Sequence, residues 1–215
     1  KSVPMLLSAA DASNFERLFH EKGILAAFKE AGFHTVFLSN QLPNHSFIDF
    51  LGEQADEWAF LKTGEGNAAF DKAYGKHKTP QVDDKGNIYD ADLLPVLDRI
   101  LAKKYKKLFI VLHTYGSHFN YMERYPRTMA YFKPDSESDA KPENRRDLVN
   151  AYDNTIRYTD FVLHGVIERL QRQGGMSAML YTSDHGENIF DDSRNLFLHA
   201  SPRASHYELA VPFLV

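Results

Sequence analysis

The chain has 215 residues, 43% of them hydrophobic and 25% charged, which is ordinary for a globular protein able to bury a sizeable core. Its net charge of -4 gives no electrostatic footprint for nucleic acid, so we expect no nucleic-acid partner. The absence of cysteine excludes thiolate metal sites and thiol nucleophiles. Every metal ligand must therefore be His, Asp, Glu or a hydroxyl group.

Helical and extended patterns alternate along the chain, which predicts an α/β fold with a largely parallel sheet. In the first half we expect a helix over 14–31, strands over 33–38 and 58–61, a loop over 63–88, a helix over 90–103 and a strand over 108–112. In the second half we expect an exposed polar segment over 133–144, a helix over 146–172, and strands over 179–182 and 211–215. No linker interrupts this order, so we expect residues 1–215 to form a single domain.

Both ends of the sequence are expected to lie inside a longer protein. It opens on Lys1-Ser2-Val3-Pro4 without a Met, and it stops within the apolar segment 211–215. We interpret it as a domain truncated at both termini. No apolar run approaches the roughly 18 residues of a membrane span, so any membrane anchor is expected outside this sequence.

Polar clusters follow two of the predicted strands directly. The first is His113-Thr-Tyr-Gly-Ser-His118, and the second is Ser183-Asp184-His185-Gly186-Glu187; a third loop contains His199. Ligands of open α/β sheets bind beyond the carboxyl ends of the strands, so we expect these loops to meet at one edge. A set of imidazole and carboxylate groups without sulfur suits Zn²⁺, or else Mn²⁺.

The Asp-His-Gly-Glu run is a plausible metal and substrate loop by spacing alone. Adjacent side chains of a strand point to opposite faces, but this restriction relaxes where the strand ends. Gly186 permits a tight turn that returns Glu187 towards the edge that carries Asp184 and His185. The alternative for Asp184 and His185 is a capping aspartate beside a buried histidine.

Five segments of the sequence resemble successive signatures of the phosphoethanolamine transferases, which belong to the sulfatase-like branch of the alkaline phosphatase superfamily. They are Ser2-Val-Pro-Met-Leu-Leu-Ser8, Leu112-His-Thr-Tyr-Gly-Ser-His118 with Arg124-Tyr125-Pro126, Ala151-Tyr-Asp-Asn154, Tyr181-Thr-Ser-Asp-His-Gly-Glu187 and Phe197-Leu-His199. Their order and spacing cover nearly the whole chain.

The resemblance implies a sulfatase-like central sheet with helices on both faces. It also implies a periplasmic catalytic domain, held at a bacterial inner membrane by an anchor outside this chain. The expected reaction moves phosphoethanolamine from phosphatidylethanolamine to lipid A or another envelope acceptor through a phospho-threonine intermediate. The family pattern places that threonine three residues before Ser2, outside the chain.

The resemblance also implies roles for individual residues. Asp184 and His185 match zinc ligands, while His118, Glu187 and His199 match catalytic residues around the transferred group. The two histidines of that second set match ligands of a further zinc ion. Asn40, Gln41, His113 and Glu187 match substrate-binding positions.

Two other readings remain open from the sequence. The chain is also compatible with another enzyme of the superfamily, a sulfatase or a glycerol-phosphate transferase. A binding module on the same fold without catalytic activity is the alternative from a different class. Such a module need hold no zinc, so metal content separates it from an enzyme.

Overall fold

A computed structural model describes residues 2–43, 47–75 and 88–215. The chain divides into two compact units, residues 1–114 and residues 115–215. Within the described residues, no helix combines the length and the apolar character needed to cross a membrane.

The first unit is built on a four-stranded sheet in the order β3-β2-β1-β4. The strands are β1 (His34–Ser39), β2 (Glu57–Phe60), β3 (Glu65–Gly66) and β4 (Leu108–His113). β1 pairs in parallel with β2 and β4, whereas β3 joins β2 antiparallel. In register, Ser39 at the end of β1 lies opposite His113 at the end of β4, so both strands end at the same edge.

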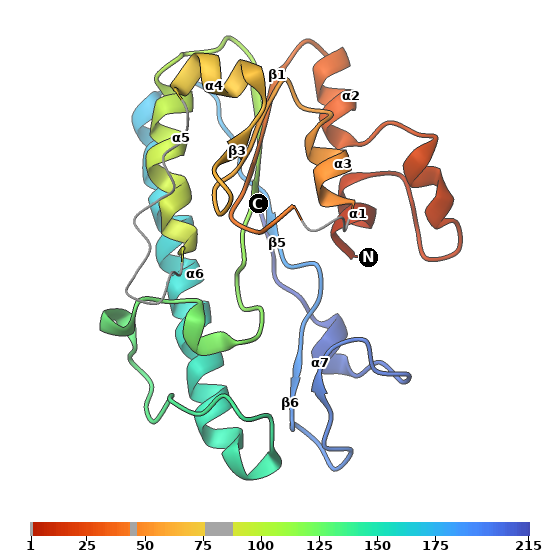
Figure 1. Cartoon of the computed structure of the whole chain (residues 1–215), viewed down its shortest axis with the longest axis vertical. Coiled ribbons are helices and arrows are strands. Elements are labelled where there is room, and N and C mark those ends of the chain that lie inside the picture. The colour runs from red at the N-terminus through yellow and green to blue at the C-terminus, as the bar shows by residue number, and fades with distance from the viewer. Residues whose placement is uncertain (1, 44–46, 76–87) are drawn as a thin grey trace. The chain divides into compact units, whose positions relative to one another are not determined.

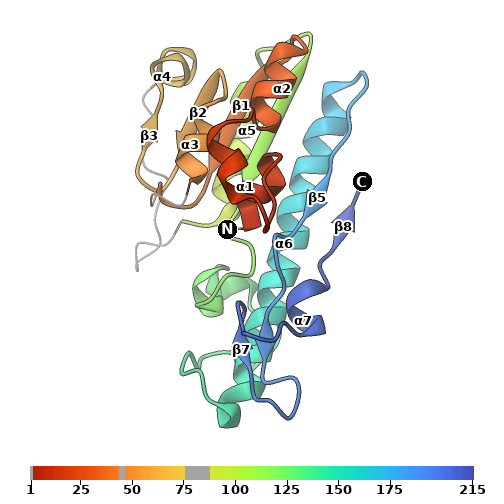
Figure 2. The same ribbon diagram turned by 90° about the vertical axis from the view of Figure 1, so that its right-hand side faces the viewer.

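Helices cover both faces of this sheet, because the strand side chains alternate between two apolar layers (Figures 1 and 2). Val36 and Leu38 point into the layer shared with α4 (Ala68–Tyr74) and α5 (Leu93–Leu101). Phe37 points into the opposite layer. That layer is shared with the helices α1 (Ser2–Leu7), α2 (Ile24–Glu30) and α3 (Ile48–Gly52). The prediction of a largely parallel sheet with helices on both faces is confirmed.

The second unit is organised around α6 (Arg145–Gln173), a helix of 29 residues. Two antiparallel strand pairs accompany it: β5 (Tyr181–Thr182) with β8 (Phe213–Leu214), and β6 (Asn188–Ile189) with β7 (Phe197–Leu198). α7 (His206–Leu209) lies between β7 and β8 in the chain. The apolar core of the unit packs α6 against the β6–β7 hairpin and the short 3-10 helix η3 (Tyr121–Glu123).

Four predicted elements differ from the structure. The strands expected over 179–182 and 211–215 are reduced to the two-residue strands β5 and β8, which pair antiparallel outside the four-stranded sheet. The helix expected over 14–31 is broken into the 3-10 helix η1 (Phe15–Phe19) and α2, and Gly23 caps the start of α2. A glycine inside a helix is unfavourable, and Gly23 also packs closely against the carbonyl of Leu7, so the chain turns there instead of continuing. The loop expected over 63–88 contains β3 and α4, whose first turn is capped by Asn67; residues 76–87 lie outside the described residues.

The buried side chain of Asn154 on α6 forms hydrogen bonds that hold the segment 131–135 against the helix. It is 1% exposed, and its Oδ1 accepts hydrogen bonds from the backbone nitrogens of Tyr131 and Phe132, both at 2.9 Å. Its Nδ2 donates to the carbonyl of Phe132 at 2.9 Å and to Asp135 Oδ2 at 3.2 Å. The buried Tyr125 hydroxyl donates to the same carboxylate oxygen at 2.6 Å.

Replacing Asn154 with Ala is expected to lower the free energy of unfolding by about 2 kcal/mol, because the part-buried backbone nitrogens of Tyr131 and Phe132 lose their acceptor and Asp135 loses one of its donors. Urea denaturation measures this loss. Asn150→Ala is the matched control, since Asn150 lies on the same helix and its side chain makes an exposed hydrogen bond to the carbonyl of Pro134. Equal losses in the two variants would contradict the role assigned to Asn154.

Candidate metal and phosphoryl-transfer site

Three predicted substrate-binding residues lie at the carboxyl ends of β1 and β4 in the first unit. His113 is 9% exposed, and its Nδ1 lies 2.9 Å from the hydroxyl of Ser39. Gln41 donates from Nε2 to the carbonyl of Thr114 at 2.9 Å. Parallel strands that end together thus bring these residues to one edge. The prediction that the loops carrying His118, Asp184, His185 and His199 meet at one edge stays a prediction.

Asn40 is fully buried at this edge. Its Nδ2 donates to Asp90 Oδ1 at 2.9 Å, while its Oδ1 has no hydrogen-bond partner among the described residues. The amide therefore ties the end of β1 to the segment that precedes α5. A substrate-binding role for Asn40, Gln41 and His113 stays a prediction.

The β6–β7 hairpin brings Glu187 and His199 together in the second unit. Asn188 pairs with Leu198 across the hairpin, so the residues just beyond this pair face each other. His199 Nδ1 lies 3.3 Å from Glu187 Oε1. His185, two residues before Glu187, places its ring 3.7 Å from the His199 ring, measured between centroids.

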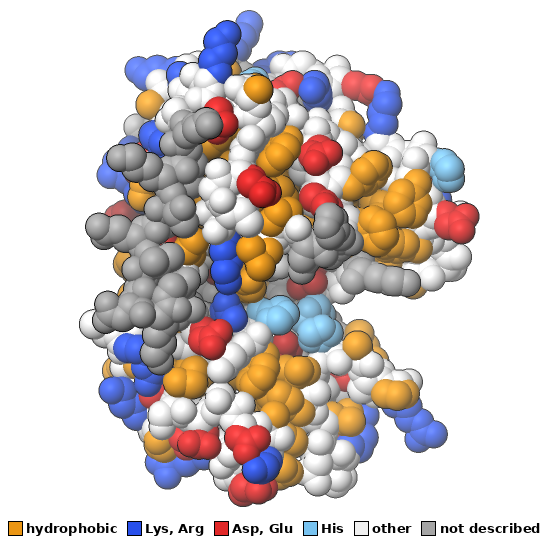
Figure 3. Space-filling view, viewed as in Figure 1, with side chains coloured by type: hydrophobic (Ala, Val, Ile, Leu, Met, Phe, Trp, Pro, Cys, Tyr) orange, Lys and Arg blue, Asp and Glu red, His pale blue; other side chains and the backbone are white. Residues whose placement is uncertain are grey.

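His185, Glu187 and His199 form the group of described residues that could hold a metal ion. One donor atom from each lies within 4.8 Å of the other two, and ligands of one zinc ion stand about 3.5 Å apart. Two imidazoles and a carboxylate are a donor set that zinc prefers, so these residues fit the predicted metal. The histidine side chains are partly exposed, 24% for His185 and 34% for His199. Histidine side chains are among the groups exposed on the face of the molecule that Figure 3 shows.

His118 and Asp184 were also predicted as metal ligands, and both lie outside that group of three. Asp184 Oδ2 is 3.7 Å from His185 Nε2, which leaves it close to the group. His118 is exposed, and its Nδ1 lies 2.5 Å from the carbonyl of Phe119. The metal-binding role of both residues stays a prediction.

The carboxylate of Glu187 is buried beside a tyrosine. It is 9% exposed, and the hydroxyl of Tyr121 donates a hydrogen bond to its Oε2. Burial and the charge of Glu187 raise the pKa of Tyr121. The same two causes raise the pKa of Tyr152 to about 12. Both phenols are therefore neutral near pH 7, and Tyr121 acts as a donor.

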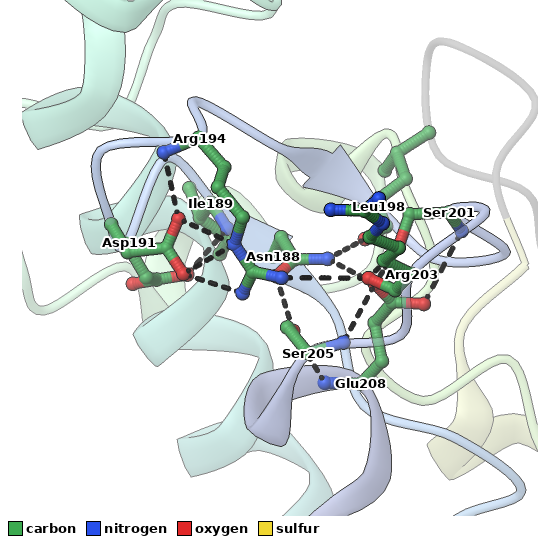
Figure 4. Close-up of polar contacts among 10 residues, drawn as sticks. Asn188, Ile189, Asp191, Arg194, Leu198, Ser201, Arg203, Ser205 and Glu208 are labelled. Atoms are coloured by element: carbon green, nitrogen blue, oxygen red, sulfur yellow. Dashed lines mark hydrogen bonds and ion pairs between the residues drawn. The ribbon is translucent and has the colours of Figure 1, made fainter.

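A buried polar platform supports the loop that carries His199 (Figure 4). Asn188 donates to the carbonyl of Leu198 at 2.9 Å and to Glu208 Oε1 at 2.7 Å, and its Oδ1 accepts from Ser205 at 2.5 Å. Glu208 also accepts from the hydroxyl of Ser201. Ser205 and Glu208 form a capping box at the start of α7, so the helix start and the hairpin share one hydrogen-bonded network.

The backbone around His199 is held in an uncommon conformation. Leu198 and Ala200 have positive φ angles of 62° and 66°, in the left-handed region that residues other than glycine rarely adopt. Such a conformation persists only when the surrounding contacts determine it. Here the contacts come from Asn188, which binds the carbonyl of Leu198, and from Glu208, which binds Ser201.

Glu208 makes the stability of this platform depend on pH. The hydrogen bond from Ser201, aided by those from Asn188 and the backbone, holds the pKa of Glu208 below its ordinary value of 4.5 despite burial. A depressed carboxylate pKa contributes stability that is present above the unfolded value and is lost as pH falls towards the folded value. We therefore expect Glu208→Gln to flatten the decline in unfolding free energy below about pH 4.5.

Urea denaturation at a series of pH values tests this expectation. Glu53→Gln removes one negative charge from an exposed glutamate of the first unit and serves as the control. An acid decline in Glu208→Gln as steep as that of the unsubstituted protein would refute the linkage.

The residues that support this site could not be assigned to it from the sequence. Tyr121 is one of eleven tyrosines, and only the fold brings it to Glu187. The pair Ser205 and Glu208 does have the Ser-x-x-Glu spacing of a capping box, which predicts the start of α7 but not its link to Asn188.

Comparison with known proteins shows that this chain is similar to phosphoethanolamine transferases. The Kdo(2)-lipid A phosphoethanolamine 7''-transferase of Salmonella typhimurium is 29% identical over 209 residues, which cover 94% of this chain and 33% of that protein. The soluble domain of lipooligosaccharide phosphoethanolamine transferase A from Neisseria meningitidis superposes with a TM-score of 0.78 at 26% identity, covering 98% of this chain and 59% of that one. The structure of the integral membrane protein of that name gives 0.77 at 25% identity, covering 98% of this chain and 37% of that one.

These findings confirm the resemblance predicted from the motifs, and they also show that the chain spans about a third of the length of the Salmonella relative. A model of the sulfatase family matches residues 1–215, so the sheet of the first unit and the histidine-bearing hairpin of the second both lie within the match. This chain therefore belongs to the sulfatase family.

Proposed function

We propose that the protein transfers phosphoethanolamine from phosphatidylethanolamine to lipid A or another envelope acceptor. The observation that carries this proposal is the similarity to a Kdo(2)-lipid A phosphoethanolamine transferase over 94% of the chain. The group of His185, Glu187 and His199 supports it, because these residues supply the donor set that such a reaction would use.

We propose that Asp184 and His185 hold one zinc ion and that His118 and His199 hold a second near the transferred group, with Glu187 beside them as a catalytic residue. The ring centroids of His185 and His199 lie 3.7 Å apart, so the two ions would be neighbours. Zinc bound there would neutralise charge on the phosphoryl group and lower the pKa of a hydroxyl nucleophile. Backbone contacts of the chain orient the ligand nitrogens of this group. Nδ1 of His185 lies 3.0 Å from the carbonyl of Gly186, and a proton on that nitrogen leaves Nε2 as the lone-pair donor.

The proposed reaction proceeds through a phospho-threonine intermediate. The threonine hydroxyl oxygen forms a bond to phosphorus as the bond to the diacylglycerol oxygen breaks, and the hydroxyl proton passes to that leaving oxygen. An oxygen of an acceptor hydroxyl or protonated phosphate group then forms a bond to phosphorus as the bond to the threonine oxygen breaks, and the acceptor's proton passes to that oxygen, which restores the threonine hydroxyl. The family resemblance puts this threonine before Ser2.

We place the reaction at the periplasmic face of a bacterial inner membrane. The Neisseria relative is described as an integral membrane protein, and its soluble domain is the part that superposes on this chain. A lipid donor and a lipid A acceptor both fit that location.

A transfer assay with the intact protein tests the proposal. Fluorescent phosphatidylethanolamine serves as donor and Kdo2-lipid A as acceptor, and mass spectrometry detects the modified acceptor. Parallel reactions with phosphatidylglycerol and with an aryl sulfate test glycerol-phosphate transfer and sulfatase activity. Turnover with phosphatidylglycerol or the aryl sulfate, and none with phosphatidylethanolamine, would replace the proposed function. A protein that binds no zinc and turns over none of the three substrates would favour a binding module.

A further inference from the structure

We propose that Tyr121 is a positioning residue that fixes the carboxylate of Glu187, and through it the ring of His199, for metal binding. The inference rests on the proposed function and assigns a role to a residue that no family motif quoted above contains.

Tyr121 is fully buried and held from several sides. Its ring makes edge-to-face contacts with Phe119 and Tyr152, each at 5.3 Å between centroids. It also belongs to the core cluster that joins α6 to the hairpin through Leu148 and Ile189. A ring packed in this way cannot swing, so the core fixes the position of its hydroxyl oxygen.

The hydroxyl of Tyr121 and the ring of His199 hold the two oxygens of Glu187 separately. Oε2 accepts from Tyr121, and Oε1 lies 3.3 Å from His199 Nδ1. With Oε2 fixed, the carboxylate plane is defined and Oε1 stays directed at His199. A proton on Nδ1 of His199 then donates to Glu187, which leaves Nε2 as the ligand atom.

Loss of the hydroxyl removes one of these two anchors. The carboxylate becomes free to rotate about its terminal bond, and Oε1 no longer defines the orientation of the His199 ring. Partners of this kind, which orient a ligand without touching the metal, typically change metal affinity by about 10- to 100-fold. The effect on binding is therefore expected to exceed the effect on folding.

The chain offers a matched control in Tyr125. Tyr125 is also fully buried, and its hydroxyl also donates to a carboxylate, at 2.6 Å to Asp135 Oδ2. Asp135 is not part of the group formed by His185, Glu187 and His199. Tyr125→Phe thus removes a buried hydrogen bond to a carboxylate, together with those that its hydroxyl accepts from Arg127 and Asn154, without removing a hydrogen bond to the metal group.

Calorimetric titration of the metal-free intact protein with zinc tests the proposal. Glu187→Ala first identifies the binding step that depends on the carboxylate. Tyr121→Phe should weaken that same step by about 10- to 100-fold, while Tyr125→Phe leaves it unchanged. Urea denaturation of both variants measures the loss of folding stability, which we expect to be at least as large in Tyr125→Phe, because the Tyr125 hydroxyl also accepts from Arg127 and Asn154.

The outcomes separate this inference from the proposed function. Zinc binding by Tyr121→Phe equal to that of the unsubstituted protein would overturn the positioning role, while transfer by the unsubstituted protein would still support the function. Equal weakening in Tyr121→Phe and Tyr125→Phe would overturn it as well, because the effect would then be general to the fold. An unsubstituted protein that neither binds zinc nor transfers phosphoethanolamine would refute the function, and the inference with it.

Discussion

Replacing His185 with Ala is expected to abolish phosphoethanolamine transfer and to weaken zinc binding by more than about 100-fold. Residues that merely orient a ligand change affinity by about 10- to 100-fold, so the loss of a ligand itself should exceed that range. His185 and His199 are the two residues that the sequence predicts as zinc ligands and that the structure places in one group with Glu187. Zinc titration and the transfer assay measure the two effects.

His164→Ala is the matched control for this substitution. His164 lies on α6, its side chain is 67% exposed, and it is near Glu168 rather than the metal group. We expect this variant to retain both zinc binding and transfer. Full zinc content and turnover in His185→Ala would remove His185 from the proposed site.

Replacing Gly186 with Ala is expected to lower the free energy of unfolding by about 3 kcal/mol and to suppress transfer. A Cβ atom at this position would lie 2.0 Å from the carbonyl oxygen of Tyr207, which is closer than any real contact of this kind. The clash is with the backbone of α7, so a rotamer change cannot relieve it. The backbone nitrogen of Gly186 also donates to the carbonyl of Glu208 at 2.8 Å, so displacement would break this bond as well.

Gly174→Ala separates this clash from the general cost of losing a glycine. Gly174 has a positive φ of 67°, but a Cβ atom there would meet nothing within 4 Å. We expect a smaller loss of stability, from backbone strain alone, and no loss of transfer. Urea denaturation of both variants makes the comparison, and a Gly186→Ala protein as stable as Gly174→Ala would show that α7 can move away.

The elements predicted most closely are those whose burial pattern repeats regularly. The helix expected over 146–172 is observed as Arg145–Gln173, because its apolar residues recur at helical spacing and Gly174 ends it. The strand expected over 108–112 is observed as Leu108–His113. The helix over 14–31 was wrong because apolar residues at nearly helical spacing continue across Gly23, where tertiary contacts favour a turn.

The candidate site was predictable only as far as it is local in sequence. The motif around Asp184 and Glu187 identifies the loop that carries His185 and Glu187, two of the three residues of the metal group, since residue types and spacing carry that information. Glu187 and His199 are twelve positions apart, and their pairing depends on the register of the β6–β7 hairpin. Its strands β6 and β7 are each two residues in length. Strands this short have too little alternation to predict pairing, and the buried tyrosine behind Glu187 depends on the fold of α6.

The hairpin that pairs Glu187 with His199 keeps its turn away from the metal group. Residues 190–196 close the loop between β6 and β7 and contribute none of the three donor atoms. Closing a flexible loop costs only about 0.6 kcal/mol more when its length doubles. Phe190 packs in the core and its backbone nitrogen donates to the carbonyl of Leu196, so only the tip between 192 and 195 is free of these contacts. Extra residues inserted between 192 and 195 should therefore be tolerated with little loss of metal affinity, and sequence length can vary there while the chemistry on either side is retained.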